Sequence, residues 1–407
     1  MKNRTRKDKP IFKAKKHGSV LGAIITLVAI AALVFVGYSA GRPIIELIRG
    51  DRQGQVTEPN TDAPDVTKDL PTVSQPKTED SSGESSQDDS YEPEPAPVDR
   101  ILYISYPGES ASDYSEYILS LAENAAGKGY TACVIELVAE GGAVLFSDSG
   151  SLANESGAVP GNAIADLGGL CSSVSGLGLT PYARVSLLSD HIVSWYDKST
   201  SYMIEGSTYR WLDDTAERGG KPWLSPFEQG SLDYTGELCL RISQAGFSGL
   251  IAGEVEFPPF RSRDLEYIGE SVKSGDRHKA LTDFAKNACD SFNNEKEFRI
   301  ELDAYDVISG GAEILSDPEV LCTKSLVVRF ELSSLDDRIT RSDGSQVSFE
   351  GLNWEYKLRA AVKLVSETLG GMGVTYQPLV AAEEGEDGVG ELMGELGFMS
   401  VIIEIGD

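Results

Sequence analysis

The stretch from residue 101 to residue 138 reads ILYISYPGESASDYSEYILSLAENAAGKGYTACVIELV, and it decides the fold class. It begins with one apolar run, Ile101–Tyr106, and ends with a second, Ala132–Val138. Between them, Asp113 and Glu116 have the spacing of a capping box that opens a helix, and Gly129 is typical of a helix end. A strand, a helix and a second strand in this order predict a parallel sheet covered by helices.

The same alternation continues along the rest of the chain. The clearest later helix is the apolar series from Leu358 to Leu369, which stops at Gly370-Gly371. Eight strands in about 310 residues match the count and size of a (β/α)8 barrel of the TIM type, which we predict for residues 99–407. The six further apolar runs are Tyr182–Leu188, Leu250–Phe257, Phe298–Val307, Leu326–Leu332, Val374–Val380 and Ser400–Ile405.

A doubly wound open sheet is the alternative arrangement of these elements. In that fold the first strand–helix turn carries a G-x-G-x-x-G that holds a dinucleotide phosphate. Here the turn reads Pro107-Gly108-Glu109-Ser110, and no P-loop motif occurs elsewhere. The turn therefore favours the barrel, and we expect no cofactor.

Residues 1–41 have the pattern of a membrane anchor. Eight basic side chains and one acid occupy residues 1–18, and the 24 residues from Gly18 to Gly41 carry no charge. About 20 apolar residues cross a bilayer as a helix, and basic residues before such a segment stay in the cytoplasm. We predict a cytoplasmic tail at 1–18 and a transmembrane signal-anchor helix at 19–41 in a bacterial cell membrane, with the following domain outside. A signal peptide cleaved after Ser39 is the alternative.

Residues 42–98 are predicted to be a disordered linker. The part from 51 to 99 holds thirteen acids against three bases, together with seven prolines and several serine clusters. It has almost no large apolar residues, so it cannot bury enough surface to offset the entropy of ordering. We interpret this segment as an acidic stalk between membrane and barrel.

The overall composition excludes several classes of function. The net charge is −28, from 64 acids and 36 bases, whereas nucleic-acid binding needs a basic surface. The five cysteines contain no C-x-x-C spacing, and the chain has three histidines. We therefore predict no nucleic-acid partner, no zinc site and no histidine-rich metal site.

Acidic residues recur at the carboxyl ends of the predicted strands, where the functional side chains of a (β/α)8 barrel gather. Glycoside hydrolysis requires a pair of carboxylates, since one protonates the leaving oxygen and the other attacks or activates water. An acidic chain also places some carboxylates at strand ends by chance. The acids at these positions are Glu136, Asp190, Glu254, Glu256, Asp303, Asp306, Glu331, Glu404 and Asp407.

Two further signals concern the third strand and the segment after it. Arg184 lies within an otherwise apolar strand, and a buried Arg usually pairs with a carboxylate. Trp195, Trp211 and Trp223 crowd the segment between the third and fourth strands. Aromatic faces suit sugar rings, although tryptophan also fills loops and cores.

Several short motifs occur in a fixed order between residues 100 and 260. They are Tyr103-Ile104-Ser105, Val134-Ile135-Glu136, Ala183-Arg184-Val185 followed by Asp190, GKPWLSPF at 220–227, and Ala245-Gly246-Phe247. In these motifs and their order the chain resembles the putative glycosyl hydrolase domain family of bacterial exported proteins, whose members are predicted (β/α)8 barrels. The resemblance implies that fold and a glycoside hydrolase activity.

One motif departs from the family pattern. The family's fourth strand reads roughly Phe-Asp-Tyr-Ile-Arg-Phe-Pro, and Phe257 and Pro258 match its end. Gly253 stands where the family has the acid expected to be catalytic, and Glu256 stands where it has Arg. Either Glu254 or Glu256 takes over the role of that acid, or the barrel has lost hydrolysis and only binds glycan.

We therefore expect a membrane-anchored, glycoside hydrolase-like barrel that acts on cell-envelope or extracellular polysaccharide. Asp190 and one of Glu254 or Glu256 are the expected catalytic pair. Arg184 would hold a neighbouring carboxylate ionised. A glycan-binding barrel without activity and an envelope scaffold or partner-binding module are the alternatives. The expected sugar contacts are Glu136, Arg184, His191, Trp223, Asp303 and Glu331.

Overall fold

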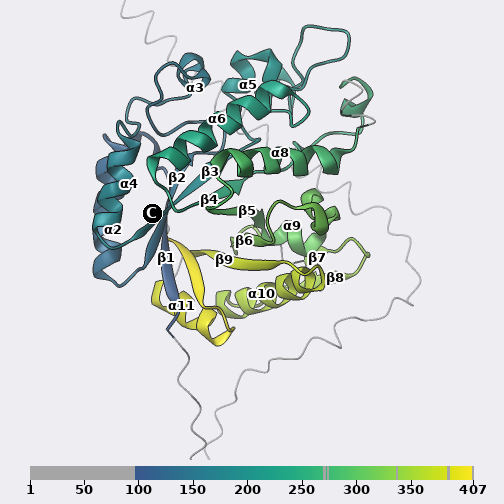
Figure 1. The fold of residues 1–407 in the computed structure, drawn as a ribbon. Coiled ribbons are helices and arrows are strands. Elements are labelled where there is room, and N and C mark those ends of the chain that lie inside the picture. Colours follow the sequence, from purple (N-terminus) through teal and green to yellow (C-terminus); the bar gives the residue numbers. More distant parts are fainter. Residues whose placement is uncertain (1–96, 269–271, 273–274, 336–337, 383–385, 406–407) are drawn as a thin grey trace, which may run out of the picture. The chain divides into compact units, whose positions relative to one another are not determined.

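The eight apolar runs form a closed barrel of parallel strands in a computed structural model of the chain (Figure 1). The structure describes residues 97–268, 272, 275–335, 338–382 and 386–405, all within one compact unit. The order around the barrel is β1-β10-β9-β6-β5-β4-β3-β2, and β1 pairs in parallel with β10, which closes the sheet and confirms the (β/α)8 prediction. The barrel strands are β1 (Asp99–Ile104), β2 (Ala132–Val138), β3 (Thr180–Ser186), β4 (Gly249–Gly253), β5 (Glu297–Asp303), β6 (Ser325–Phe330), β9 (Thr375–Ala382) and β10 (Ser400–Ile405).

The predicted tail, the predicted anchor and almost all of the predicted linker lie outside the described residues. Within the described part of the chain, no helix is both long and apolar enough to cross a membrane. The anchor at residues 19–41 therefore stays a prediction.

Helices follow most of the strands and cover the outside of the barrel. In Figure 1, α2 and α4 lie together on one side, and α6 and α8 lie together on another. The longer helices are α2 (Tyr114–Gly127), α4 (Leu167–Gly176), α6 (Gln229–Ala245), α8 (Arg277–Phe292), α10 (Trp354–Gly371) and α11 (Glu386–Glu395). The short ones are α3 (Leu152–Ser156), α5 (Val193–Tyr196) and α9 (Ala304–Ser309), with 3-10 turns η3 (Gly108–Ser110), η4 (Lys198–Thr200), η5 (Ala216–Arg218), η6 (Asp264–Glu266), η7 (Glu313–Ser316) and η8 (Pro318–Val320).

Helix α2 shows how local sequence sets these elements. The Asp113 carboxylate accepts hydrogen bonds from the backbone N–H groups of Ser115 and Glu116, at 2.8 and 3.2 Å, and so caps the helix start. The buried side chains of α2 recur at helical spacing and face the sheet. They are Tyr114, Ile118, Ala122 and Ala125.

The interior of the barrel is divided into an apolar layer and a charged layer. A cluster of buried side chains that includes Val134, Ile251, Val327, Leu379 and Ile402 fills the middle. Because alternate residues of a strand point to the same face, the positions two residues farther along also face the interior. Those positions, at the carboxyl ends of the strands, are Glu136, Gly253, Arg329, Ala381 and Glu404.

The structure differs from the sequence expectations at several boundaries. β4 ends at Gly253 rather than at Phe257, because Glu254 adopts a left-handed backbone with φ of 48°. β5 ends at Asp303, because α9 begins at Ala304. A two-stranded antiparallel hairpin that we did not predict, β7 (Arg338–Thr340) with β8 (Gln346–Ser348), lies between β6 and α10.

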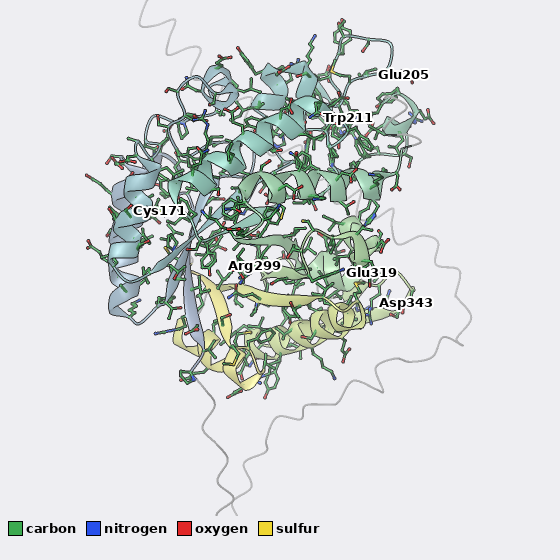
Figure 2. All side chains as sticks on the ribbon, viewed as in Figure 1. Cys171, Glu205, Trp211, Arg299, Glu319 and Asp343 are labelled. Carbon is green, nitrogen blue, oxygen red and sulfur yellow. The ribbon has the colours of Figure 1, made fainter. Side chains whose placement is uncertain are left out.

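Some aromatic residues between β3 and α6 are buried, whereas Trp195 and Tyr209 are 59% and 73% exposed. Trp211 is 2% exposed, and its ring centroid lies 4.9 Å from that of Phe260. Tyr202 packs against the same phenylalanine at 5.3 Å. Figure 2 labels Trp211 and the exposed Glu205 in this segment. Of the three tryptophans, Trp211 therefore belongs to a small core of its own, whereas Trp195 is exposed.

Candidate active site

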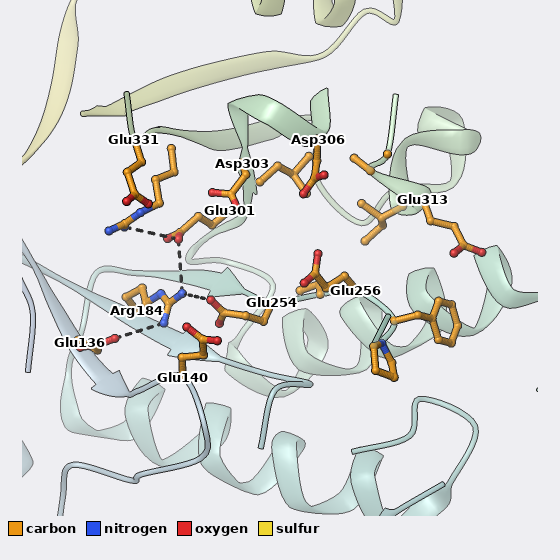
Figure 3. A pocket seen from close by; sticks show the side chains of 18 of the residues that line it. Glu136, Glu140, Arg184, Glu254, Glu256, Glu301, Asp303, Asp306, Glu313 and Glu331 are labelled. Carbon is orange, nitrogen blue, oxygen red and sulfur yellow. Dashed lines mark hydrogen bonds and ion pairs between the residues drawn. The ribbon is translucent and has the colours of Figure 1, made fainter. Parts of the chain in front are cut away.

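A cavity of about 400 Å³ opens at the carboxyl ends of the barrel strands (Figure 3). This volume is within the range of small-molecule sites, and the position is the one at which barrels of this type carry their function. The lining is dominated by charged side chains from β2, β3, β5, β6 and β10 and from the segments that follow β2, β4, β5 and β6. The charged lining residues are Glu136, Glu140, Arg184, Glu254, Glu256, Arg277, Glu301, Asp303, Asp306, Glu313, Arg329, Glu331 and Glu404.

Arg184, in β3, is the centre of an ionic cluster at the floor of this cavity. Its guanidinium contacts the carboxylates of Glu254 at 2.5 Å, Glu136 at 3.3 Å and Glu301 at 3.4 Å. Figure 3 shows these three carboxylates converging on it. Arg184 is only 4% exposed, so its charge depends on these partners for stabilisation, and they raise its pKa. The expectation that Arg184 pairs with a neighbouring carboxylate is met by this geometry.

The same arginine explains the glycine at the departure from the family motif. A Cβ atom on Gly253 would lie 2.4 Å from Nη2 of Arg184 and 2.8 Å from its Cζ. No side chain fits there while the guanidinium keeps its position. The next residue, Glu254, supplies a carboxylate that contacts Arg184. The backbone of Glu254 is in the left-handed region, which is uncommon for a non-glycine residue. A carboxylate therefore stands one residue after Gly253, bound to Arg184.

A second ion pair continues the cluster toward β6 and β10. Arg329 pairs with Glu404 and lies 3.9 Å from Glu301. Its guanidinium also lies over the ring of Tyr103 in β1, 5.6 Å from the centroid. Glu301 therefore lies between two arginines, and it is 8% exposed. These contacts make the floor of the cavity a connected network of buried charges.

Glu256 stands apart from the arginines and among other acids. It points into the cavity beside Asp306 in Figure 3. Its side chain reaches solvent, but the cavity walls crowd its carboxyl group. This crowding, followed by the negative charges of Asp306, Glu254 and Asp303, raises the pKa of Glu256 to about 7. The pKa of Asp303 rises to about 6, mainly from burial and then from Glu301 and Asp306.

The two glutamates that follow β4 thus have opposite environments. Glu254 forms an ion pair with the Arg184 guanidinium, whereas burial and then the surrounding acids raise the pKa of Glu256 to about 7. Acid-catalysed hydrolysis of a glycosidic bond uses a pair of carboxyl groups, one of which acts as the proton donor. The cavity therefore holds two carboxyl groups, two residues apart in the sequence, in different electrostatic surroundings.

Asp190, the other predicted catalytic acid, does not line the cavity. It lies four residues beyond the end of β3 and is 2% exposed. Its Oδ1 accepts hydrogen bonds from the backbone N–H groups of Ile192 and Val193, and its Oδ2 accepts one from the Tyr234 hydroxyl at 3.1 Å. Burial raises its pKa to about 7. The structure thus does not bring Asp190 together with Glu254 or Glu256, because its Oδ1 accepts from the backbone at the start of α5 and its Oδ2 accepts from Tyr234.

His191 and Trp223, predicted to contact sugar, also lie outside the lining of this cavity. The Nδ1 atom of His191 is 2.8 Å from the carbonyl oxygen of Pro222, and its ring packs edge-on against Trp223. The Trp223 indole N–H donates to Asp213 at 3.0 Å. Both side chains therefore stabilise the segment that follows β3. The predicted site residues that the cavity does bring together are Glu136, Arg184, Glu254, Glu256, Asp303 and Glu331.

The structure adds Glu301, Arg329 and Glu140 to the site, and it places Glu404 and Asp306 there as well. Glu301 could have been found from the alternation of side chains in β5, because residues two apart in a strand share a face and Glu301 lies two residues before Asp303. Arg329 lies two residues after Val327 in β6 and therefore shares its interior face. Glu140 lies in the loop after β2, where side chains do not alternate as they do in a strand.

In the described residues, no group of three His, Cys, Asp or Glu side chains is arranged to hold a metal ion.

Comparison with known proteins agrees with this fold. The family described as putative glycosyl hydrolase domain matches residues 102–312, which run from β1 to the segment after α9. A search of curated proteins finds no match.

Several solved structures resemble the chain at low identity. A hypothetical protein from Ruminiclostridium thermocellum is 15% identical, with a TM-score of 0.40 over 49% of this chain and 96% of that one. The glycoside hydrolase domain of PelA from Pseudomonas aeruginosa is 11% identical, with a TM-score of 0.39 over 76% and 95%. Alpha-L-fucosidase isoenzyme 2 from Paenibacillus thiaminolyticus is 11% identical, with a TM-score of 0.47 over 77% and 46%.

Proposed function

The chain belongs to the putative glycosyl hydrolase domain family, and we propose that its barrel hydrolyses a cell-envelope or extracellular polysaccharide. The observation that carries the proposal is the pair of glutamates after β4. Both line one cavity, one is bound to an arginine, and the other keeps its proton to about pH 7. Family membership and this pair together favour hydrolysis of a glycosidic bond over other reactions of a carboxylate site.

In the proposed mechanism Glu256 is the general acid. It donates its proton to the glycosidic oxygen as the bond to the leaving sugar breaks. Glu254 supplies the second carboxylate, which either attacks the anomeric carbon or activates a water molecule. Arg184 is a positioning residue, because its ion pair with Glu254 holds that carboxylate in place.

The test is hydrolysis of purified cell-wall and extracellular polysaccharides by the full-length protein in mild detergent, with analysis of products. We expect shortened products that are lost in Glu256→Gln and in Glu254→Gln. Glu205→Gln is the matched control, since Glu205 is exposed and lies outside the cavity lining. Cleavage that persists in both cavity variants would refute the assignment of these residues.

A barrel that binds glycan without cleaving it is the second candidate. It is favoured by Gly253, because the position of the family's acid carries no carboxyl group here and Arg184 fills the space. It predicts polysaccharide binding with no shortened products under any condition tested. Binding that is weakened by Glu256→Gln, without cleavage by the wild-type protein, would favour this candidate.

We also propose that residues 19–41 anchor the barrel to a bacterial cell membrane, with the barrel outside the cytoplasm. The support is the uncharged segment and the basic residues before it. The test is fractionation of cells that express the full chain or a chain without residues 19–41. Recovery of the full chain in the soluble fraction, or protection of its barrel from protease added to intact spheroplasts, would refute the proposal.

A further inference from the structure

The connection between β5 and β6, residues 304–324, forms one wall of the cavity from short helical turns. It contains α9, of six residues, and the 3-10 turns η7 and η8, whereas α6 and α8 are seventeen and sixteen residues long. Because short helices have little stability of their own, the position of this β5–β6 segment depends on its contacts with neighbouring elements. Its residues that line the cavity are Asp306, Gly311, Ala312, Glu313 and Ile314.

Helix α8 contacts the β5–β6 segment near the cavity. Arg277, at the start of α8, pairs with Glu313 at 2.8 Å. The Nε2 atom of the next residue, His278, lies 3.2 Å from the carbonyl oxygen of Ile314 and 3.3 Å from the backbone nitrogen of Asp317. The first turn of α8 therefore holds the part of the segment that is nearest the cavity.

Two cysteines meet at the opposite end of the same segment. Cys289 lies in the last turn of α8, and Cys322 lies three residues before Ser325, where β6 begins. Because the helices of a parallel barrel run back to the amino ends of its strands, this helix end and this strand start lie at the same end of the barrel. The two side chains are in hydrogen-bond contact, and both are partly exposed. The last turn of α8 and the end of the β5–β6 segment thus present two thiols to each other.

The surroundings of this pair differ from those of the other three cysteines. The hydrogen bond that Cys322 donates lowers the pKa of Cys289, and the positive charge of Lys286, one helical turn earlier, acts in the same direction. The thiolate is the form of cysteine that attacks a disulfide, so a lowered pKa favours reaction at Cys289. Burial raises the pKa of the other three thiols and hides them from reagents in solution. These buried cysteines are Cys133, Cys171 and Cys239.

We propose that Cys289 and Cys322 form a disulfide by exchange with a disulfide oxidant, and that this bond fixes the end of the β5–β6 segment to α8. The inference goes beyond the proposed function and does not depend on it. Disulfides persist outside the cytoplasm, which is where we propose that the barrel lies.

The exchange has two steps. The Cys289 thiolate attacks one sulfur of the oxidant, the other oxidant sulfur leaves, and a mixed disulfide remains on Cys289. The Cys322 sulfur then attacks the sulfur of Cys289 and releases the second oxidant sulfur. Each leaving sulfur takes up the proton of the cysteine that replaces it. Two protein thiols are thereby oxidised to one disulfide, and the oxidant disulfide is reduced to two thiols.

The test treats the full-length protein in mild detergent with oxidised glutathione and then counts free thiols after denaturation. The five cysteines are free before treatment, and we expect three free thiols after it. Mass spectrometry of a digest should find the peptides of Cys289 and Cys322 joined. Closing a loop of this length should raise the urea midpoint by about 1 M, and amide hydrogen exchange should slow in residues 304–321.

Two variants separate this pair from the other thiols. Cys322→Ala should form no internal bond and show no rise in urea midpoint on oxidation. Cys171→Ala is the matched control, since Cys171 is buried and lies outside the pair; its four thiols should fall to two, and the rise should persist. Each oxidised variant is compared with its own reduced form, so a loss of stability from the substitution itself does not affect the result.

Several results would overturn the inference. They are five free thiols after oxidation, a glutathione adduct on Cys289 that does not close onto Cys322, and a bond between Cys289 and Cys239. A bond between Cys289 and Cys322 that leaves exchange in residues 304–321 unchanged would overturn the fixing of the cavity wall. None of these measurements needs a glycan, so they are independent of whether the proposed hydrolysis is found.

Discussion

Gly253→Ala is the most direct perturbation of the ionic cluster under the cavity. The added Cβ would lie 2.4 Å from Nη2, 2.8 Å from Cζ and 3.0 Å from Nε of Arg184. Ordinary contacts between such atoms are about 3.5–4.0 Å, so the guanidinium has to move by roughly 1 Å. The backbone of Gly253 is not in the left-handed region, so alanine is otherwise compatible with it.

The cost follows from what the displaced guanidinium loses. Overpacking of a filled site costs about 1–3 kcal/mol, and complete loss of a buried ion pair costs about 3–5 kcal/mol. A shift of this size lengthens the contacts to Glu254, Glu136 and Glu301 without abolishing them. We therefore expect Gly253→Ala to lower the free energy of unfolding by about 2–4 kcal/mol.

A double-mutant cycle with Arg184→Ala tests the cause of that loss. Arg184→Ala alone should cost about 3–5 kcal/mol, because it leaves three carboxylates without their cation. In that background the space beside Gly253 is free, so adding the methyl group should cost less than about 0.5 kcal/mol. The expected coupling energy is thus about 1.5–4 kcal/mol.

The assay is urea unfolding followed by tryptophan fluorescence, with the free energy taken from the linear dependence on denaturant. Gly127→Ala is the matched control, since nothing lies within 4 Å of its added Cβ and it is in a helix. The control should leave stability unchanged or raise it slightly. The reasoning is refuted if Gly253→Ala is as stable as wild type, or if it costs the same with and without Arg184.

Three further predictions concern protonation and buried hydrogen bonds. Glu256→Gln should lower kcat/KM about 10²–10⁴-fold, because it removes the general acid. Wild-type activity should fall as pH rises through about 7, because Glu256 must be protonated to act as an acid. A pH–rate profile without this fall above pH 7 would contradict the assignment. The pKa of Asp190 is raised from 3.8 to about 7, so the folded state binds the proton more tightly and stability should fall by up to about 4 kcal/mol as pH rises across that range. Asp190→Asn should remove most of this dependence, as measured by thermal melts at acid and neutral pH, and an unchanged dependence would reject Asp190 as its source. Tyr234→Phe removes the hydroxyl that donates to Asp190 and should cost about 1–3 kcal/mol in urea unfolding, whereas a neutral result would mean that the bond contributes little.

Local sequence was enough to predict the eight strands of the barrel, although not the β7–β8 hairpin. The barrel strands fall on the eight apolar runs, and Asp113 caps α2 as its spacing with Glu116 indicated. These features depend on neighbours in the chain, such as the alternation of side chains in a strand and the hydrogen bonds of a helix start. The strand-end rule for barrels likewise located Glu136, Glu254 and Glu256 in the cavity.

The tertiary structure alone decided which carboxylates meet. Asp190 follows β3 as the strand-end rule requires, but its oxygens accept hydrogen bonds from α5 and Tyr234 and do not reach the cavity. Glu301 was overlooked, although it lies between Arg184 and Arg329. The direction of a side chain past the end of a strand depends on the loop that follows, and the loop depends on distant contacts.

Gly253 and Glu254 show most clearly what the sequence determines and what only the folded structure determines. By itself the sequence determined that the family's acid is missing at 253 and that acids stand at 254 and 256. Only the folded barrel shows that a guanidinium from the neighbouring strand fills the space beside Gly253 and binds Glu254. The physical reason is that propensity and periodicity act over a few residues. The exclusion of one side chain by another, and the ion pair that Glu254 forms, depend on Arg184, which lies 70 residues away in the sequence.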